Sequence, residues 1–323
     1  MLVAATIKIL TVDPRWQHPD RIAFMREYLP DGCELVIPDS FEPEHLRQEA
    51  KTARVLLGGQ VPLTAELMAA APDVCLIGKL GTGVDSIDVE AATTAGLPVA
   101  HAPGWLRASP VAEHVFTLLL MLCRRPWLWS SGEALPLHLP LEGATIGIVG
   151  LGNIGQRVAQ RAAAFGMAVM AHTRTRGKFQ PEGFAVQETE TLDELLGQAD
   201  YVVLSLPLLP ETEGLIGSRE LALMKSSSFL INVSRGRHVV SDDLVTALRA
   251  GEIAGAGLDV TDSEPLPATH PLRSLPNVVL SPHVAGQSEW VQRESCRVLC
   301  TSIAQALNGE RVQAIVNPEI YSS

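Results

Sequence analysis

Six residues in the middle of the chain form the pattern G-x-G-x-x-G. In order, they are Gly150, Leu151, Gly152, Asn153, Ile154 and Gly155. A strand-like apolar run, 145–149, precedes the pattern, and a helix-like run, 156–165, follows it. This order is typical of dinucleotide binding, because the glycines allow a tight turn, close approach of a pyrophosphate and close helix packing. We therefore expect phosphates to bind at this turn, beside the free N–H groups and positive dipole end of the following helix.

The next predicted strand, 167–171, indicates which dinucleotide the chain binds. In NAD-binding chains this strand usually ends in an acidic residue that accepts a hydrogen bond from the ribose 2′-OH. Here the strand is followed by His172, Thr173, Arg174, Thr175 and Arg176. Hydroxyl and guanidinium groups suit a 2′-phosphate, so the sequence favours NADP as the cofactor, with NAD as the alternative. In a second interpretation the arginines belong to a solvated surface loop, but their place after this strand favours phosphate recognition.

Three charged side chains that can act on a small acid follow strand-like runs further along the chain. Arg235 follows the run 229–233, and a guanidinium can bind a carboxylate through two parallel charge-assisted hydrogen bonds. Glu264 and His283 follow the next two runs. A carboxylate bonded to one imidazole nitrogen fixes the tautomer of the ring and favours its protonated form, which can deliver a proton to a carbonyl oxygen. We expect all three at the carboxyl edge of a parallel sheet, where open α/β sheets bind their ligands.

Each of these three residues also has an ordinary structural interpretation. An arginine alone is usually part of a structural salt bridge, a glutamate alone is usually a surface carboxylate, and a histidine alone is often a core residue. The set in this order, after a dinucleotide-binding pattern, is far more specific. It favours a catalytic role for Arg235, Glu264 and His283.

The rest of the chain alternates strand-like and helix-like runs, with proline or glycine at most junctions. The predicted strands are 7–12, 34–37, 55–57, 74–78, 98–100, 145–149, 167–171, 201–206, 229–233, 255–260 and 278–281. The predicted helices are 20–28, 43–51, 64–70, 89–94, 110–123, 156–165 and 288–307. Alternation of this kind predicts an α/β fold built of doubly wound parallel sheets.

A long loop, 126–143, follows the helix that Pro110 begins, and it contains Trp127 and Trp129. Loops of this length are uncommon inside a compact domain and often form an interface or a lid. The tryptophans either serve a contact between subunits or pack under the loop. The apolar helix beside them favours the contact.

Composition limits the classes of protein to which the chain can belong. Its 323 residues are enough for two domains, and 46% hydrophobic and 19% charged residues are typical of a soluble globular protein. The net charge of −11 argues against nucleic acid and anionic membranes as partners. We find no apolar run of membrane-spanning length and no secretion signal in 1–8. The five scattered cysteines indicate a reducing compartment and no metal site, so we expect a cytoplasmic protein.

Short motifs along nearly the whole chain match those of one known family. They are Gly81-Thr82-Gly83-Val84-Asp85 with Ile87-Asp88, Val111-Ala112-Glu113-His114, Phe165-Gly166-Met167, Pro207 with Glu211-Thr212, Arg235-Gly236, Glu264-Pro265, Pro282-His283 and Val316-Asn317-Pro318. With these motifs the chain resembles the D-isomer-specific 2-hydroxyacid dehydrogenases. At Thr173, where aspartate or glutamate is usual, it is similar to the branch of NADP-preferring glyoxylate/hydroxypyruvate reductases.

The resemblance implies a role for each candidate residue. Arg235 is expected to hold the 2-oxo acid, His283 to be the acid–base residue and Glu264 to be its partner. The backbone N–H groups around Leu80, Gly81 and Thr82 are expected to hold the substrate carboxylate. Asp259 is expected to bond the nicotinamide carboxamide. Further cofactor contacts are expected from Leu206, Pro207, Thr212, Val233, Ser234 and Gly286, together with Thr82, Arg235 and His283.

The resemblance also implies the domain organisation. A Rossmann coenzyme domain, 104–286, is expected to be inserted in a flavodoxin-like substrate domain made of 1–103 and 287–323. Hydride transfer is expected in the cleft between the domains. The helix from Pro110 lies where proteins of this family form two-fold dimers, so we expect a homodimer.

The sequence thus predicts an oxidoreductase that transfers a hydride between NADP(H) and a small 2-oxo acid or D-2-hydroxy acid. A corepressor-like protein that senses nicotinamide is one alternative, against which the lack of a disordered or basic extension argues. A phosphite dehydrogenase-like enzyme, which keeps a similar triad, is the other. Formate dehydrogenase is disfavoured, because Glu264 stands where that branch carries glutamine. The sequence does not identify the substrate or decide whether Trp127, Trp129 or Trp290 contacts it.

Overall fold

The structure is a computed structural model that describes residues 6–59, 61–130 and 140–322. The chain divides into two compact units. The first unit runs to Leu106 and resumes at Ser288, and the second runs from Arg107 to Gln287. The boundaries expected from the sequence follow residues 103 and 286. In the structure they follow residues 106 and 287. Part of the predicted interface loop, 131–139, lies outside the described residues.

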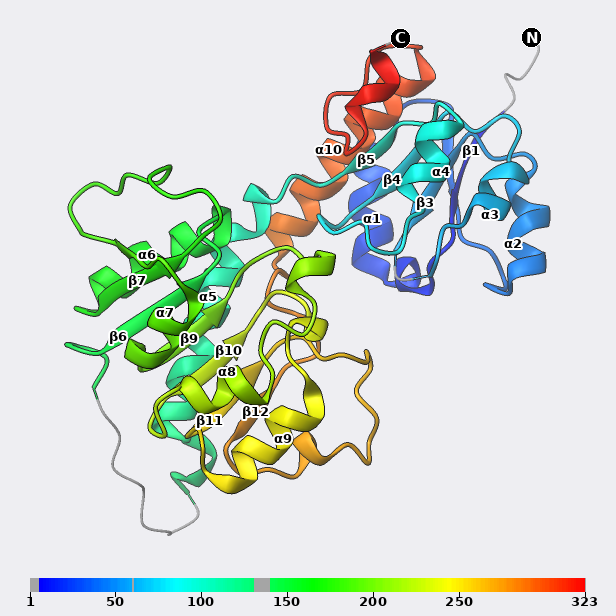
Figure 1. Cartoon of the computed structure of the whole chain (residues 1–323). Helices are drawn as coiled ribbons and strands as arrows, with labels where there is room; N and C mark the ends of the chain where they lie inside the picture. The colour runs from blue at the N-terminus through cyan, green and yellow to red at the C-terminus, as the bar shows by residue number, and fades with distance from the viewer. Residues whose placement is uncertain (1–5, 60, 131–139, 323) are drawn as a thin grey trace, which may run out of the picture. The chain divides into compact units, whose positions relative to one another are not determined.

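The first unit is built on five parallel strands in the order β2-β1-β3-β4-β5. Figure 1 labels β1, β3, β4 and β5 of this sheet. The strands are β1 (Ile7–Thr11), β2 (Cys33–Val36), β3 (Val55–Gly58), β4 (Leu76–Lys79) and β5 (Val99–His101). Its helices are α1 (Pro19–Tyr28), α2 (Pro43–Ala50), α3 (Ala65–Ala69), α4 (Val89–Thr94) and α10 (Glu289–Leu307). The strand order 2-1-3-4-5 is that of flavodoxin-like sheets, as the resemblance implied.

Helices cover both faces of this sheet. Successive residues of a strand point to opposite faces, so each buried strand contributes side chains to both. Ile9 and Leu57 pack on one face in a cluster that includes residues of α1 and α10. Leu10 and Leu56 pack on the other face in a cluster with residues of α2, α3 and α4. The C-terminal helix α10 therefore completes a core whose strands come from the start of the chain.

The second unit is built on seven parallel strands in the order β12-β11-β10-β9-β6-β7-β8. The strands are β6 (Thr145–Val149), β7 (Ala168–His172), β8 (Gln187–Glu188), β9 (Tyr201–Leu204), β10 (Phe229–Asn232), β11 (Gly255–Leu258) and β12 (Val278–Leu280). From β8 to β11 this is the Rossmann order 3-2-1-4-5-6, with β12 added at the edge. The order reverses between β6 and β9, and ligands of doubly wound sheets bind at that point.

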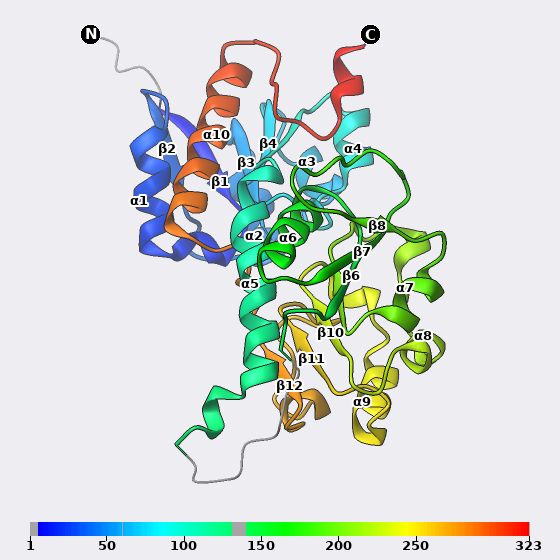
Figure 2. The ribbon, with the colours of Figure 1, turned by 90° about the vertical axis from the view of Figure 1, so that its left-hand side faces the viewer.

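The helices of the second unit also cover both faces of its sheet (Figure 2). They are α5 (Trp105–Arg124), α6 (Asn153–Ala164), α7 (Leu192–Gln198), α8 (Ser218–Leu223) and α9 (Ser241–Ala250). One core cluster joins α5 and α6 to the sheet, and the other joins α7, α8 and α9 to it. Short 3₁₀ helices are η1 (Pro14–Gln17), η2 (Pro126–Leu128), η3 (Pro210–Thr212), η4 (Gly236–His238), η5 (Pro271–Arg273) and η6 (Pro318–Tyr321).

Helix α5 differs from its prediction in two respects. It begins at Trp105, so Pro110, expected to open the helix, lies inside it. Proline lacks the N–H that would bond the carbonyl four residues earlier, but this loss falls close to the helix start and the helix continues. By length and composition α5 could also cross a membrane. The prediction that the chain has no apolar run of membrane-spanning length is therefore wrong. About half of the apolar window, 56%, is buried inside the protein.

Candidate active site

The glycine pattern forms a tight turn between β6 and α6, and two of its glycines are required by close packing. Gly150 has a φ of +97°, and a Cβ there would lie 2.7 Å from the Ser205 carbonyl oxygen. A Cβ at Gly155 would lie 2.1 Å from the Gly150 carbonyl oxygen. The space around Gly152 differs, because a Cβ at that position would meet no atom within 4 Å. Packing therefore explains the first and third glycines but not the second.

The open space at Gly152 fits a bound dinucleotide. Gly152 is the N-cap of α6, and no side chain caps the helix there. Beside it, Ser205 after β9 donates its hydroxyl to the Gly150 carbonyl at 2.7 Å, which fixes the turn at the reversal point of the sheet. A helix N-terminus with its N–H groups exposed to an open space is suited to a pyrophosphate. Gly150, Gly152, Asn153, Ile154 and Gly155 therefore lie in the strand–turn–helix arrangement that the fingerprint requires.

The segment after β7 presents polar and basic groups. Thr173 is half-buried, and Arg174, Thr175 and Arg176 are exposed. The Arg176 guanidinium lies 3.5 Å from a carboxylate oxygen of Glu190. Among the residues that the structure describes, none bonds the Arg174 guanidinium. Arg174 is therefore the arginine of this segment that is available to an added anion.

The segments after β9 and β10 are bonded to each other through Ser234. Its hydroxyl donates to the Leu206 carbonyl at 2.6 Å and accepts from the Leu206 N–H at 3.2 Å. The Thr212 hydroxyl donates to the Pro207 carbonyl at 3.0 Å. Val233 is buried beside them. These four predicted cofactor contacts, with Ser234, therefore form one connected wall along the carboxyl edge of the sheet.

The register of three neighbouring strands brings the predicted catalytic residues to one edge. Asn232 pairs with Leu258, and Leu258 pairs with Leu280, so the segments that follow leave the sheet side by side. Arg235 begins one of these segments, and its guanidinium donates to the Ser234 carbonyl at 2.8 Å. A Cβ at Gly236 would lie 1.9 Å from the Thr261 carbonyl oxygen, so only glycine fits there. The turn of Arg235 is thus packed against the segment that leads to Glu264.

His283 and Glu264 form a direct pair. The His283 Nδ1 lies 2.7 Å from the Glu264 Oε2, and the other oxygen of Glu264 lies 3.4 Å from the Thr261 N–H. A carboxylate only accepts hydrogen bonds, so the proton of this pair is on Nδ1. This leaves Nε2 as the nitrogen that can exchange a proton with a ligand. The ring is partly exposed, with 46% of its side-chain surface accessible.

The backbone of His283 is held in an unusual conformation by Asp259. His283 has a φ of +55°, in the left-handed region that few residues other than glycine adopt. The buried Asp259 carboxylate accepts from the Val284 N–H and the Ala285 N–H, each at 2.9 Å, and from the Ser281 hydroxyl at 2.6 Å. Its carbonyl accepts from the His283 N–H at 2.8 Å. Asp259 thus organises the whole turn that carries the imidazole.

The electrostatics of Asp259 follow from these bonds. Burial by itself raises the pKa of this carboxyl, but the hydrogen bonds from His114, Ser281, Ala285 and Val284 outweigh burial and lower the pKa below its usual range. His114 on α5 lies 3.4 Å from Asp259 and 2.7 Å from the Ser281 hydroxyl. Asp259 is therefore ionised and anchored. Its Oδ2, which accepts from Ala285, keeps a lone pair for a further donor.

The predicted contacts to the substrate carboxylate lie in the first unit. Leu80 is buried and Gly81 and Thr82 are half-buried, directly after β4. The Thr82 hydroxyl donates to the Ala102 carbonyl at 3.1 Å, and the Thr82 carbonyl lies 3.0 Å from the His101 Nδ1. These bonds fix the loop to the end of β5. Its polar backbone thus lies at the carboxyl edge of the first sheet.

Gly286 closes the turn of His283 in the second unit. Its carbonyl accepts from the Arg107 guanidinium at 3.1 Å, and a Cβ on Gly286 would lie 3.3 Å from the Arg107 side chain. The large apolar side chains Trp105, Trp127, Trp129 and Trp290 are all exposed.

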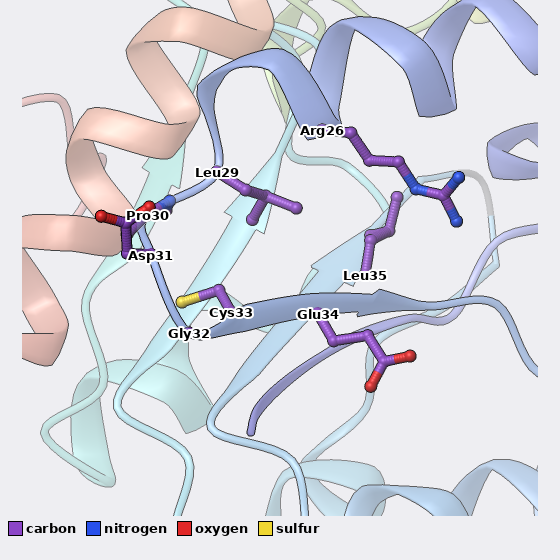
Figure 3. Close-up of a pocket in the computed structure, with 8 residues that line it drawn as sticks. All are labelled: Arg26, Leu29, Pro30, Asp31, Gly32, Cys33, Glu34 and Leu35. Carbon is purple, nitrogen blue, oxygen red and sulfur yellow. The ribbon is translucent and has the colours of Figure 1, made fainter. Parts of the chain in front are cut away.

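A hollow lies away from these residues, at the start of β2 in the first unit (Figure 3). Its volume is about 340 Å³, and Arg26, Asp31 and Cys33 contribute to its lining. Ligands of parallel sheets bind at the carboxyl ends of the strands, and this hollow lies at the amino end of β2. It is therefore not part of the candidate site.

Comparison with known proteins decides the family. The family model for the D-isomer specific 2-hydroxyacid dehydrogenase, NAD binding domain, matches residues 122–285. Along the chain, a glyoxylate reductase of Aeropyrum pernix is 34% identical over 325 residues, covering 93% of this chain and 96% of its own length. This chain belongs to the D-isomer specific 2-hydroxyacid dehydrogenase family. It is thus an oxidoreductase that acts between 2-hydroxy acids and 2-oxo acids, as the motifs predicted.

Two further members of the family place the chain more closely. It is 33% identical to the D-3-phosphoglycerate dehydrogenase of Methanocaldococcus jannaschii, but it spans only 59% of the length of that protein. The solved structure of the NADPH-dependent glyoxylate/hydroxypyruvate reductase of Sinorhizobium meliloti, in complex with NADP and malonate, is 30% identical. It matches with a TM-score of 0.82, covering 97% of this chain and 98% of that one. These relatives favour neither a corepressor-like sensor nor a phosphite dehydrogenase.

The sequence did not indicate the contacts that hold the dehydrogenase site in place. Ser205 fixes the glycine turn, Ser281 and His114 anchor Asp259, and Gly236 lets the Arg235 turn meet its neighbour. Their contacts join segments that are far apart along the chain. Gly236 and His114 belong to the family motifs and Ser281 adjoins one of them, but the motifs alone do not indicate these contacts.

Proposed function

We propose that this dehydrogenase is an NADP(H)-dependent reductase of small 2-oxo acids of the glyoxylate and hydroxypyruvate type. The observation that carries the proposal is the 2.7 Å hydrogen bond between His283 and Glu264, on the sheet edge from which Arg235 also extends. A proton-donating imidazolium and a carboxylate-binding guanidinium together suit a substrate that is both an acid and a carbonyl compound.

Each side chain of this set has a distinct task in reduction. The coenzyme, when bound at the glycine turn, supplies a hydride to the carbonyl carbon. Arg235 binds and orients the 2-oxo acid. The Nε2–H of the His283 imidazolium donates its proton to the carbonyl oxygen, which becomes the hydroxyl. Glu264 accepts from Nδ1 throughout, so it stabilises the charged ring before the transfer and fixes the neutral tautomer after it.

Further contacts complete the proposed site. The backbone around Leu80, Gly81 and Thr82 is proposed to bind the substrate carboxylate, since its N–H groups lie at the carboxyl edge of the first sheet. Asp259 is proposed to accept from the nicotinamide carboxamide through the lone pair left on Oδ2. The wall formed by Leu206, Pro207, Thr212, Val233 and Ser234, with Gly286, is proposed to contact the rest of the coenzyme.

The preference for NADP is supported by the segment after β7. Thr173 stands at the end of the strand, where an acidic residue would select NAD, and the exposed guanidinium of Arg174 can pair with a 2′-phosphate. The S. meliloti relative with 30% identity is NADPH-dependent. Arg176 can contribute as well, after exchanging its contact with Glu190 for the phosphate.

Steady-state kinetics of three variants test the cofactor preference. We expect R174A to lower kcat/KM for NADPH by about tenfold and to leave NADH almost unaffected, because one charge-assisted bond to phosphate is lost. T173D should reverse the preference, since a carboxylate repels the phosphate and accepts from the 2′-OH. R219A, which removes an exposed arginine that pairs with Asp193, is the control. A wild-type preference for NADH would refute this part of the proposal.

A panel of 2-oxo acids tests the reaction itself. Glyoxylate, hydroxypyruvate, pyruvate, phenylpyruvate and 2-ketogluconate are assayed with NADPH and NADH. We expect the smallest acids to be reduced fastest, and H283A and R235A to lose most of the activity while remaining folded. An H283A enzyme that reduces the best substrate at the wild-type rate would rule out the catalytic assignment.

We also propose that the protein is a cytoplasmic homodimer. The exposed indoles of Trp127 and Trp129 follow directly on α5, an apolar helix that is only about half buried in the protein, at 56%. A second copy of the chain would cover them. Light scattering after size-exclusion chromatography measures the mass, and we expect W129R to shift it from two chains to one.

A further inference from the structure

His238 is a fully buried histidine to which no catalytic task has been given. It lies in η4, three residues after Arg235, and its relative exposure is 0%. Its Nδ1 lies 3.0 Å from the Arg235 carbonyl oxygen, and its Nε2 lies 3.2 Å from the Pro207 carbonyl oxygen. The ring therefore stands between the segment after β9 and the segment after β10. Both segments belong to the proposed coenzyme and substrate site.

The surroundings of this ring are already rich in hydrogen bonds. The Arg235 carbonyl also accepts from the Asn232 side chain at 2.9 Å and from the His238 N–H at 3.2 Å. Ser234 lies 3.4 Å from Nδ1, and its hydroxyl donates to the Leu206 carbonyl. These bonds fix the carbonyl of Arg235 from one side. The imidazole lies on the other side of the Arg235 carbonyl, with its second nitrogen beside the Pro207 carbonyl.

We propose that His238 is a positioning residue that holds the backbone of Arg235 against the Pro207 segment, and so places the guanidinium for the acid. This rests on the proposed function, in which Arg235 binds the 2-oxo acid. The two carbonyl oxygens are acceptors, so each ring nitrogen can serve its carbonyl only when it carries a proton. A neutral imidazole donates one of these two bonds, and its shape fills the space between the two segments.

Charge and burial agree with a neutral ring. Burial lowers the pKa of His238, and the positive charge of Arg235 acts in the same direction. The hydrogen bonds to Pro207 and Arg235 act in the opposite direction and are outweighed. The ring is therefore a neutral donor whose bond does not compete with water. An uncharged donor of similar shape should replace it in part.

Three substitutions separate the bond from the packing. H238N keeps a donor near the place of Nδ1, H238Q keeps one near the place of Nε2, and H238L fills the space without any donor. We expect H238L to lower kcat/KM for the 2-oxo acid by about tenfold to a hundredfold, with a raised KM, because Arg235 is displaced. We expect kcat/KM of H238N or H238Q to be at least about threefold higher than that of H238L. The variant with the higher kcat/KM identifies which ring nitrogen donates the hydrogen bond. Wild-type kcat/KM in H238L, or no recovery by either variant, overturns the proposal.

A half-buried histidine elsewhere in the second unit gives the control. The His270 ring accepts from the Leu272 N–H at 3.3 Å and lies outside the proposed site. We expect H270L to keep kcat/KM within about twofold of wild type, although it also loses a ring hydrogen bond.

Hydrogen–deuterium exchange measures the positioning without any substrate. We expect peptides covering 206–213 and 233–239 of H238L to exchange at least about fivefold faster than in wild type, with 145–155 unchanged. Equal exchange in H238L and wild type overturns the proposal, whatever the substrate of the enzyme is. An inactive wild-type enzyme would instead refute the proposed function, and the exchange result would still stand.

Discussion

The Nδ1 of His283 and the Oε2 of Glu264 lie 2.7 Å apart, although 19 residues separate them in the chain. They meet because β11 and β12 are parallel neighbours whose following segments leave the sheet at the same edge. Between them, Asp259 holds the turn of the histidine and Gly236 lets the arginine turn approach. The pair is thus a product of strand order and register.

Replacing Glu264 separates its charge from its hydrogen bond. In E264Q the amide oxygen can still accept from Nδ1, but the negative charge that favours the imidazolium is lost. We expect kcat/KM for the 2-oxo acid to fall by about 10²-fold in E264Q and further in E264A, which also loses the tautomer control. The control is E289Q in the first turn of α10, where an exposed glutamate pairs with Arg293. Equal rates in E264Q and wild type would contradict the assigned role.

The three glycines of the fingerprint should divide into two classes. Gly152 has ordinary backbone angles and open space, so G152A should fold with a free energy of unfolding within about 0.5 kcal/mol of wild type. Its added methyl group occupies the space proposed for the pyrophosphate, so the Kd for NADPH should rise by about tenfold or more. Fluorescence titration of the coenzyme measures this change.

In G155A the added Cβ would lie 2.1 Å from the Gly150 carbonyl oxygen, so the turn must shift. We expect G155A to lose roughly 2–4 kcal/mol of stability, which thermal unfolding can detect. The contrast between the two variants is the test. A G152A protein that binds NADPH as well as wild type would show that the pyrophosphate does not lie at this turn.

Much of the fold could be predicted from the sequence, because its strands are short apolar runs bounded by glycine or proline. The predicted strand 145–149 is β6 and the predicted helix 89–94 is α4, both without any change of bounds. The predicted strand 55–57 is β3, which extends to Gly58. The two-residue strand β8 and the helices α7 to α9 were not predicted. Their sequences are short and mixed in polarity, so only packing against the sheet identifies them.

The site was predicted by residue type but not by its supporting contacts. Arg235, Glu264 and His283 stood out as charged groups after apolar runs. The left-handed backbone of His283 and the donors Ser281, Val284 and Ala285 to Asp259 could not be inferred, because they depend on how β11 and β12 turn after the sheet. The same holds for Pro110, which lies inside α5 although proline usually stands at a helix start.

Asp259 should matter for stability as well as for activity. In D259N an amide NH₂ replaces one carboxylate oxygen and faces a backbone N–H, so Val284 or Ala285 loses its acceptor. We expect a loss of about 2–4 kcal/mol in the free energy of unfolding and a fall in kcat, because the His283 turn loosens.

The pKa of Asp259 is lowered in the folded protein. The contribution of Asp259 to the free energy of unfolding is therefore complete above the unfolded pKa of about 3.9 and is lost as the pH falls through the folded pKa. D242N, in the exposed first turn of α9, is the control.

A buried neutral histidine makes stability depend on pH in a defined direction. The pKa of His238 is lowered in the folded protein, so below the unfolded value of about 6.5 the unfolded chain binds a proton that the folded chain does not. Wild-type stability therefore falls as pH decreases from about 6.5 toward the folded pKa, by at most about 1.4 kcal/mol per pH unit from this residue.

H238L lacks the titrating group, so its thermal unfolding midpoint should approach or pass that of wild type on acidification, by about 2–4 °C per kcal/mol. Other carboxylates and histidines titrate equally in both proteins and cancel in the difference. A difference between the two midpoints that stays constant from about pH 7.5 to about pH 5.5 would show that His238 is not neutral and buried as described.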